Sequence, residues 1–165
     1  MTASEIDSST QSAPDPAPLC VDEYPSRVSM HHTDAAGVVY IGHPVQWAQV
    51  GMENLFRAAG HPVEALGRAD VHYPMVRQVI NHHRKLRLGD ALVVRTFVSH
   101  VGNRSFTTTT QVAGPDGAVH VTVELTGVAV GRDGSKPAAG TWLRDLRSGA
   151  ARHGWTADQT KEDRL

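Results

Sequence analysis

The chain has 165 residues, of which 40% are hydrophobic, and a formal net charge of −1. This length suits one ordinary domain, and the nearly neutral charge offers no basic excess for a phosphate backbone, so we expect no nucleic-acid partner. The sequence has no apolar run long enough to cross a membrane, and its first twenty residues lack the basic start and apolar centre of a targeting peptide. With one cysteine, Cys20, the composition predicts a cytoplasmic protein without an internal disulfide.

The N-terminal end of the chain differs in composition from the remainder. Residues 1–20 are rich in Ser, Ala, Pro and Asp, which bury too little apolar surface to offset the entropy of ordering, so we predict a disordered tail. A first strand is expected over residues 24–32, where Val28 and Met30 alternate with polar residues. It leads into a small-residue loop that carries Asp34.

One long helix follows this loop. Pro44 suits the first helical position, and Gly60 suits the left-handed residue just beyond the last turn. Between them, apolar residues recur at spacings of three and four and form one stripe: Val45, Ala48, Met52, Leu55, Phe56 and Ala59. Asp34 therefore precedes a helix start closely, which places a carboxylate beside free backbone N–H donors and indicates a reaction site.

From about Val71 the apolar period changes from 3.6 to 2, which predicts antiparallel strands joined by tight turns. Gly102-Asn103 is expected to form a two-residue hairpin turn, and residues 119–129 alternate most regularly. After about residue 132 the chain is rich in Gly, Ala and Arg. Trp142, Leu143 and Leu146 indicate a short amphipathic turn that packs on the body.

This order of elements predicts an α+β fold in which a curved antiparallel sheet wraps around one long central helix. We expect the domain to span residues 21–132 and the extension at 133–165 to be partly mobile. One helix cannot cover so wide a sheet. The exposed flank therefore predicts pairing with a second subunit, in a homodimer or a homotetramer.

The run Asp-Ala-Ala-Gly-Val-Val-Tyr at residues 34–40, followed by the helix with Trp47, resembles the active-site signature of hotdog-fold acyl thioesterases of the 4-hydroxybenzoyl-CoA thioesterase type. The resemblance covers about residues 24–131 and includes the Leu-Gly-Asp turn at 88–90. It implies hydrolysis of an acyl-CoA or acyl-carrier-protein thioester to a free acid and a thiol. No cofactor is implied, because coenzyme A or phosphopantetheine is part of the substrate.

The resemblance also implies roles for particular residues. Asp34 matches the catalytic carboxylate, which acts as nucleophile or as general base, and the backbone N–H of Ile41 matches an oxyanion donor. Gly37, Tyr40 and Gly42 are expected to contact the substrate. The chain departs from the family at two positions. Family members often have an acidic residue where this chain has His32, and usually a Tyr where it has Pro44.

The residues alone favour the same chemistry. Hydrolysis of a thioester requires a base or nucleophile, which Asp34 can supply, and hydrogen-bond donors for the developing oxyanion, which the helix start can supply. The other interpretation of Asp34 is a loop residue whose side chain caps its own backbone. His43 is either an acid or donor toward the acyl carbonyl or a helix cap. Glu53 is either a catalytic carboxylate, since some hotdog enzymes place theirs on this helix, or a solvated or interface residue. Two other functions stay open: a hotdog dehydratase or hydratase that uses His43 and Glu53, and a non-catalytic acyl-binding module.

Two further clusters have less specific interpretations. His31 and His32, like His82 and His83, are neighbours on expected strands, so their side chains should point to opposite faces, and we predict no metal site. The basic run at Arg84, Lys85 and Arg87 either binds a phosphate-bearing arm of the substrate or is a solvated strand end.

Overall fold

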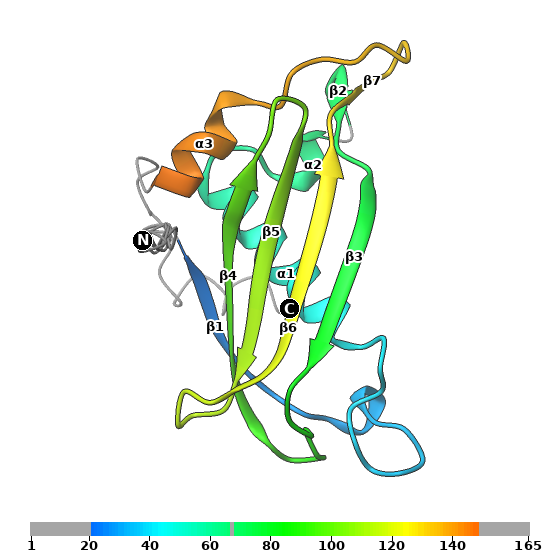
Figure 1. Cartoon of the computed structure of the whole chain (residues 1–165), viewed down its shortest axis with the longest axis vertical. Helices are drawn as coiled ribbons and strands as arrows, with labels where there is room; N and C mark the ends of the chain where they lie inside the picture. The colour runs from blue at the N-terminus through cyan, green and yellow to red at the C-terminus, as the bar shows by residue number, and fades with distance from the viewer. Residues whose placement is uncertain (1–20, 67, 149–165) are drawn as a thin grey trace, which may run out of the picture.

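The computed structural model describes residues 21–66 and 68–148 and has the expected α+β architecture. Five antiparallel strands form one sheet in the order β1-β4-β5-β6-β3, and the longest helix, α1, lies behind it (Figure 1). The strands of this sheet are β1 (Asp22–Arg27), β3 (Met75–His82), β4 (Ala91–Val101), β5 (Ser105–Ala113) and β6 (Val119–Val128). The remaining elements are the 3-10 helix η1 (Met30–His32), the helices α1 (Pro44–Ala58), α2 (Val63–Leu66) and α3 (Thr141–Ser148), and a small sheet of β2 (Val71–His72) and β7 (Val130–Gly131).

The boundaries of α1 agree with the capping residues in the sequence. Pro44 occupies the first turn, where a missing N–H costs nothing, and Gly60 has a φ of +78° just after the helix. Gly60 donates its N–H to the carbonyl oxygen of Arg57 at 3.0 Å, and thereby satisfies an orphan acceptor of the last turn. The helix buries one stripe against β1, β4, β5 and β6. The predicted central helix is therefore confirmed.

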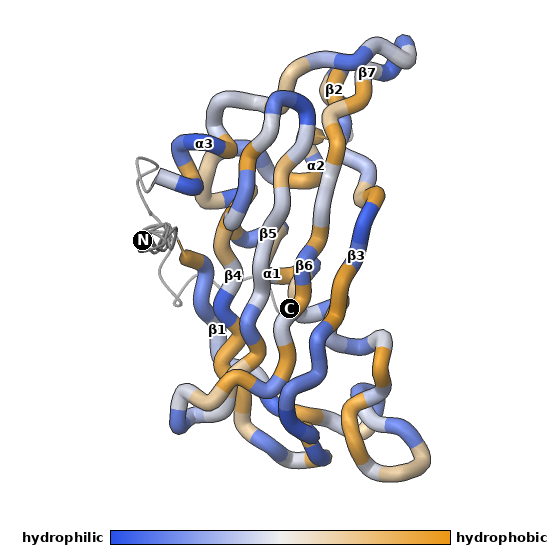
Figure 2. The backbone as a smooth tube through the Cα atoms, viewed as in Figure 1, coloured by the Kyte–Doolittle hydropathy of each residue, from blue (hydrophilic) through white to orange (hydrophobic). Residues whose placement is uncertain are grey.

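The core lies between α1 and the inner face of the sheet. Along β6, Val121, Val123 and Leu125 are almost completely buried, and the residues between them are half-buried, as strict alternation predicts. The tube in Figure 2 shows apolar and polar residues alternating along β4 and β6. One apolar cluster surrounds the start of α1 at Trp47 and Ala48, and a second surrounds its end at Leu55 and Phe56.

Helix α3 closes the second cluster. Leu143 and Leu146 are fully buried, and the ring of Trp142 lies edge-on to Phe56, with 4.9 Å between ring centroids. The apolar spacing in this segment predicted an amphipathic turn, and the structure extends it to two turns of helix that contact β4. Part of the chain after residue 132 thus contributes to the core. The predicted disordered tail at 1–20, Cys20 and residues 149–165 lie outside the described residues.

Two local predictions are wrong. The first strand ends at Arg27 rather than His32, because residues 30–32 form η1 instead. Here the N–H of Ser29 donates to Nδ1 of His32, and the N–H of His32 donates to the carbonyl oxygen of Ser29. These local hydrogen bonds take the place of strand pairing with β4. The turn after β4 spans three residues, 102–104, rather than two.

Sheet pairing leaves two edges. The strand β1 contains Pro25, which lacks an N–H and suits an edge that pairs on one side only. The other edge, β3, carries the exposed apolar residues Met75 and Val76. None of the helices in the described segments is both long enough and apolar enough to span a membrane.

Candidate functional site

The loop between η1 and α1 holds Asp34 in a fixed backbone conformation. The N–H of Asp34 donates to the carbonyl oxygen of Val38 at 2.9 Å, and the N–H of Gly37 donates to the carbonyl oxygen of Asp34 at 3.0 Å. Gly37 adopts a φ of +70°, a conformation that glycine reaches without strain. This tight turn projects the Asp34 side chain into solvent.

The carboxylate of Asp34 uses only part of its hydrogen-bonding capacity. Oδ1 accepts the N–H of Ala36 at 2.8 Å, which is the local capping bond that the alternative interpretation predicted. Oδ2 accepts no hydrogen bond from any residue that the structure describes. One oxygen therefore orients the group, and the other is available to react.

The loop is attached to the sheet through the connection between β3 and β4. The N–H of Val39 donates to the carbonyl oxygen of Leu86 at 2.9 Å, and Val38 forms an isolated bridge with Arg87. These contacts place the Asp34 turn beside the basic run that precedes β4.

Free backbone donors follow later in the same loop, just before α1. The N–H groups of Ile41 and Gly42 donate to no acceptor in the described part of the chain, and Ile41 is 67% exposed. The ring of exposed Tyr40 lies over Gly42, where an added Cβ would approach within 3.2 Å of the ring. Glycine at position 42 thus keeps this stretch of backbone open, with free N–H groups beside the positive end of the helix dipole.

His43 directly precedes α1, but its side chain makes no capping hydrogen bond, which overturns the helix-cap interpretation. Its ring instead packs among other rings in the interior. The ring centroids of His43 and His32 lie 4.1 Å apart, those of His31 and His32 lie 3.9 Å apart, and Trp47 stands edge-on to both His32 and His43. His32 and His43 are buried, whereas His31 is exposed.

Burial, together with the neighbouring rings of His43 and His31, lowers the pKa of His32 to about 4. Burial also lowers the pKa of His43, with His31 as the second cause. Both buried rings are therefore neutral near pH 7. The hydrogen bond from Ser29 occupies Nδ1 of His32 and fixes the proton of the neutral ring on Nε2.

The histidine cluster was missed by sequence reasoning because the neighbours His31 and His32 were assigned to a strand. On η1 their rings lie on the same side and meet His43, which is eleven residues further along the chain. The available signal was the pair of adjacent histidines together with a histidine just before Pro44. We predicted no metal site because adjacent histidines on a strand point to opposite faces. This premise is wrong for His31 and His32, which lie on η1 and not on a strand.

Glu53 lies far from the start of α1. Ten residues separate it from His43, which at about 1.5 Å per residue is roughly 15 Å along the axis. Its Oε1 accepts a hydrogen bond from Nε2 of Gln49 at 2.9 Å on the same helix. The structure thus does not bring His43 and Glu53 together within one chain.

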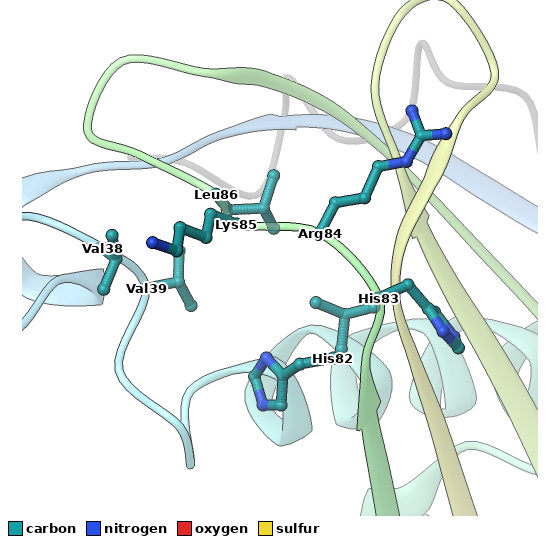
Figure 3. Close-up of a pocket in the computed structure, with 8 residues that line it drawn as sticks. Val38, Val39, His82, His83, Arg84, Lys85 and Leu86 are labelled. Atoms are coloured by element: carbon teal, nitrogen blue, oxygen red, sulfur yellow. The ribbon is translucent and has the colours of Figure 1, made fainter.

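A cavity of about 230 Å³ opens beside the Asp34 loop (Figure 3). Apolar side chains line one part, and the residues at the end of β3 line the other: Val38, Val39, Leu86 and Val121, with His82, His83, Arg84 and Lys85. In Figure 3, Lys85 extends toward Val38 and Val39, and Arg84 points the other way. The side chains of Arg84 and Lys85 form no ion pair with any described residue. Two unpaired cations thus stand at a partly apolar cavity.

On the central strands, Phe106 and Thr108 of β5 are fully buried and Phe97 of β4 is half-buried. Phe106 packs edge-on to Phe56 in the second apolar cluster, so it fills the core. Oγ1 of Thr108 is buried and has no hydrogen-bond partner among the residues that the structure describes.

Comparison with solved structures shows the same architecture. A 1,4-dihydroxy-2-naphthoyl-CoA thioesterase from Synechocystis, Slr0204, superposes with a TM-score of 0.69 at 17% identity, over 76% of this chain and 94% of that one. The gentisyl-coenzyme A thioesterase BH1999 superposes with a TM-score of 0.66 at 20% identity, over 74% of this chain and 99% of that one. These likenesses identify the fold as the hotdog fold.

Comparison by sequence gives the family. A curated protein of Synechocystis sp. (strain ATCC 27184 / PCC 6803 / Kazusa), sll0410, which is named as a candidate esterase, is 29% identical over 75 residues. This alignment spans 46% of this chain and 45% of that protein, so it covers less than half of either. The model of the thioesterase-like superfamily matches residues 28–141, well over half of the chain. The chain therefore belongs to the thioesterase-like superfamily.

Proposed function

We propose that this protein hydrolyses an acyl thioester, carried on coenzyme A or on an acyl carrier protein, to a free acid and a thiol. The observation that carries the proposal is the geometry of Asp34. One carboxylate oxygen is anchored by the N–H of Ala36, and the other accepts no hydrogen bond from a described residue. The N–H groups of Ile41 and Gly42, further along the same loop, donate to no described acceptor and so can serve as oxyanion donors. Membership of the thioesterase-like superfamily supports the reaction class.

The reaction needs only groups that this chain supplies. As a general base, Oδ2 of Asp34 takes a proton from water, and the oxygen of that water attacks the thioester carbonyl carbon. As a nucleophile, Oδ2 attacks that carbon itself, and the thiolate leaves the tetrahedral intermediate to give a mixed anhydride between the acyl group and Asp34, which water then cleaves. In both routes the N–H of Ile41 stabilises the negative oxygen of the tetrahedral intermediate, and the departing thiolate gains a proton. Neither route uses a redox cofactor or a metal.

The cavity with Arg84 and Lys85 offers a binding site for the substrate beside the loop that carries Asp34. Coenzyme A and phosphopantetheine both carry phosphate on a long, partly apolar arm. The apolar lining of the cavity suits that arm, and the cations of Arg84 and Lys85 suit its phosphates. We expect Gly37, Tyr40 and Gly42, which belong to the same loop as Asp34 and Ile41, to contact the bound substrate.

A second subunit completes the proposed enzyme. In one chain Asp34 is exposed, and electrostatic stabilisation of an oxyanion is strongest where water is excluded. The strand β3 offers an edge with exposed Met75 and Val76. We place the pairing with a second copy at this edge, in a homodimer or in a homotetramer built from two such dimers.

Thioester hydrolysis is favoured over a dehydratase or hydratase. That function requires His43 and Glu53 to act together, but His43 is buried and roughly 15 Å of helix separates the two. A non-catalytic acyl-binding module would keep the cavity and would not need the free oxygen of Asp34.

The test is release of free thiol from a panel of aromatic, short-chain, long-chain and β-keto acyl-CoA esters, with each acyl group also offered on a carrier protein. Asp34→Asn is the matched variant, because its side-chain oxygen can still accept the N–H of Ala36. Turnover by the wild-type protein that Asp34→Asn loses supports the proposal. Turnover that survives in Asp34→Asn, or ligand binding without thiol release from any ester, rejects it in favour of a site at His43 or of a binding module.

A further inference from the structure

We infer that His31, His32 and His43 form a binding site for a divalent transition metal ion of the Zn²⁺ class. Each of these residues offers one ring nitrogen, and the three nitrogens lie within 4.8 Å of one another. Imidazole nitrogen is a preferred ligand of zinc, and three histidines with one open position are a known ligand set for this ion. The site is independent of the proposed hydrolysis.

The spacing of the nitrogens is close to what a metal requires. With zinc–nitrogen bonds of about 2.0–2.1 Å in tetrahedral geometry, ligand nitrogens stand about 3.4 Å apart. The separations of up to 4.8 Å therefore need to close by at most about 1.4 Å. Rotation of His31 can supply much of this closure, because its side chain is exposed and makes no hydrogen bond to a described residue.

Backbone hydrogen bonds hold two of the three ligands, His32 and His43, in place without a metal. The N–H of Tyr40 donates to the carbonyl oxygen of His32 at 2.9 Å, which joins η1 to the segment before α1. The N–H of His43 donates to the carbonyl oxygen of Tyr40 at 2.9 Å in the same segment. Trp47 forms an apolar wall against His32 and His43, on the side away from solvent. An apolar wall of this kind limits the access of water to a metal.

His32 determines the cost of binding. Its Nδ1 accepts the N–H of Ser29 at 2.9 Å, so the ring proton is on Nε2. Metal binding at Nδ1 must displace the Ser29 N–H, and binding at Nε2 must move the ring proton to Nδ1, which then no longer accepts the Ser29 N–H. Either route changes the environment of the Ser29 amide, which therefore reports on occupation of the site.

The consequence of binding is local. A metal would join η1 to the start of α1, and these two elements flank the loop that carries Asp34. The ion would thus hold the ends of this loop together. Its effect should appear as increased thermal stability, because a ligand that binds only the folded state raises the transition temperature.

The test uses the full-length protein without an affinity tag, after removal of metal with a chelator. Co²⁺ is titrated while its visible absorption bands are followed, and Zn²⁺ is then added as a competitor. The expected result is saturable binding of one ion per chain, displacement of Co²⁺ by Zn²⁺, a shift of the Ser29 amide resonance and a higher transition temperature with Zn²⁺.

The variant His31→Ala should weaken binding at least tenfold and remove the thermal shift, and His43→Asn should do the same. His31 is exposed, so its replacement leaves the core intact even if His43→Asn folds poorly. His100→Ala removes an exposed histidine from β4 and is the matched control, which should bind like the wild type. Absence of saturable binding, or binding that His31→Ala leaves unchanged, overturns the inference, and the latter result assigns the ions to other surface histidines.

Discussion

Asp22 is a buried carboxyl group at the start of β1, where it accepts a hydrogen bond from Nδ2 of Asn54 at 3.1 Å. Burial raises its pKa from the usual 3.8 to about 6, against the opposing effect of the Asn54 hydrogen bond. The folded state therefore binds this proton more tightly than the unfolded state does. The resulting stability is present at low pH and is lost as the pH rises through about 6.

We predict that the free energy of unfolding of the wild-type protein falls by about 2 kcal/mol, relative to Asp22→Asn, between pH 4.5 and pH 7.5. The amide of the variant keeps an oxygen for the Asn54 hydrogen bond and has no proton to lose. Urea unfolding of both proteins at the two pH values measures the difference. Equal pH dependence in the two proteins would show that burial does not perturb this carboxyl group.

The candidate site shows which residues a sequence can assign. Asp34 is predicted because a carboxylate in a loop of small residues before a helix start is a local pattern, whereas the roles of Ile41 and Gly42 are predicted from the family resemblance. All three roles stay predictions. The histidine cluster was not found, because it depends on the 3-10 turn at η1, and a hydrogen bond from Ser29 to a side-chain nitrogen stabilises that turn. The raised pKa of Asp22 could not be predicted from the sequence either, because it depends on burial by segments that are distant along the chain.

Among the elements, α1 approaches the sheet most closely at Gly51. A Cβ added there would overlap the Oγ1 of Thr96, a buried residue on β4 whose hydroxyl is hydrogen-bonded to Oγ1 of Thr110 at 2.8 Å. Glycine at this position is therefore required by packing, despite its low helix propensity.

Gly51→Ala should lower the free energy of unfolding by about 1–2 kcal/mol, because an overpacking cost of about 1–3 kcal/mol outweighs the gain in helix propensity. Chemical denaturation of the wild type, Gly51→Ala, Thr96→Ala and the double variant measures the coupling. Gly51→Ala should cost less in the Thr96→Ala background, where the overlapping hydroxyl is gone. A stabilising effect of Gly51→Ala in the wild-type background contradicts this packing.

The elements themselves were predicted better than their ends. The helix and the strands after it follow from apolar periods of 3.6 and 2, which are properties of single segments. The pairing of β2 with β7 joins residues about sixty positions apart, through strands of two residues each, and such short strands leave no period to detect. The end of β1 was misplaced for the same reason that hid the histidine cluster.

For the whole molecule, the two edges of the sheet differ in their capacity to pair. Pro25 and flanking charged residues protect β1, whereas β3 presents Met75 and Val76, with Val76 62% exposed. An unprotected apolar edge is a template for another strand. The proposed subunit interface therefore lies at β3.

A charge at this edge should prevent assembly. We predict that the wild-type protein is at least dimeric and that Val76→Asp is monomeric at micromolar concentration, as measured by light scattering coupled to size-exclusion chromatography. Val63→Asp, on α2 away from the sheet, introduces the same charge at an exposed valine and should leave the assembly unchanged. A monomeric wild-type protein, or a dimer that survives Val76→Asp, argues against pairing at β3.

The central claim, that the Asp34 carboxylate drives thioester hydrolysis, is tested most directly by kcat/KM of Asp34→Asn on the best ester of the panel. Asp116→Asn is the matched control, because Oδ1 of Asp116 accepts the N–H of Ala118 in a similar exposed turn between β5 and β6. Loss of the free carboxylate should lower kcat/KM by about 100-fold or more in Asp34→Asn, on the scale of other groups that act in the transition state, and leave Asp116→Asn at the wild-type value. Equal activity in Asp34→Asn and Asp116→Asn would contradict the account.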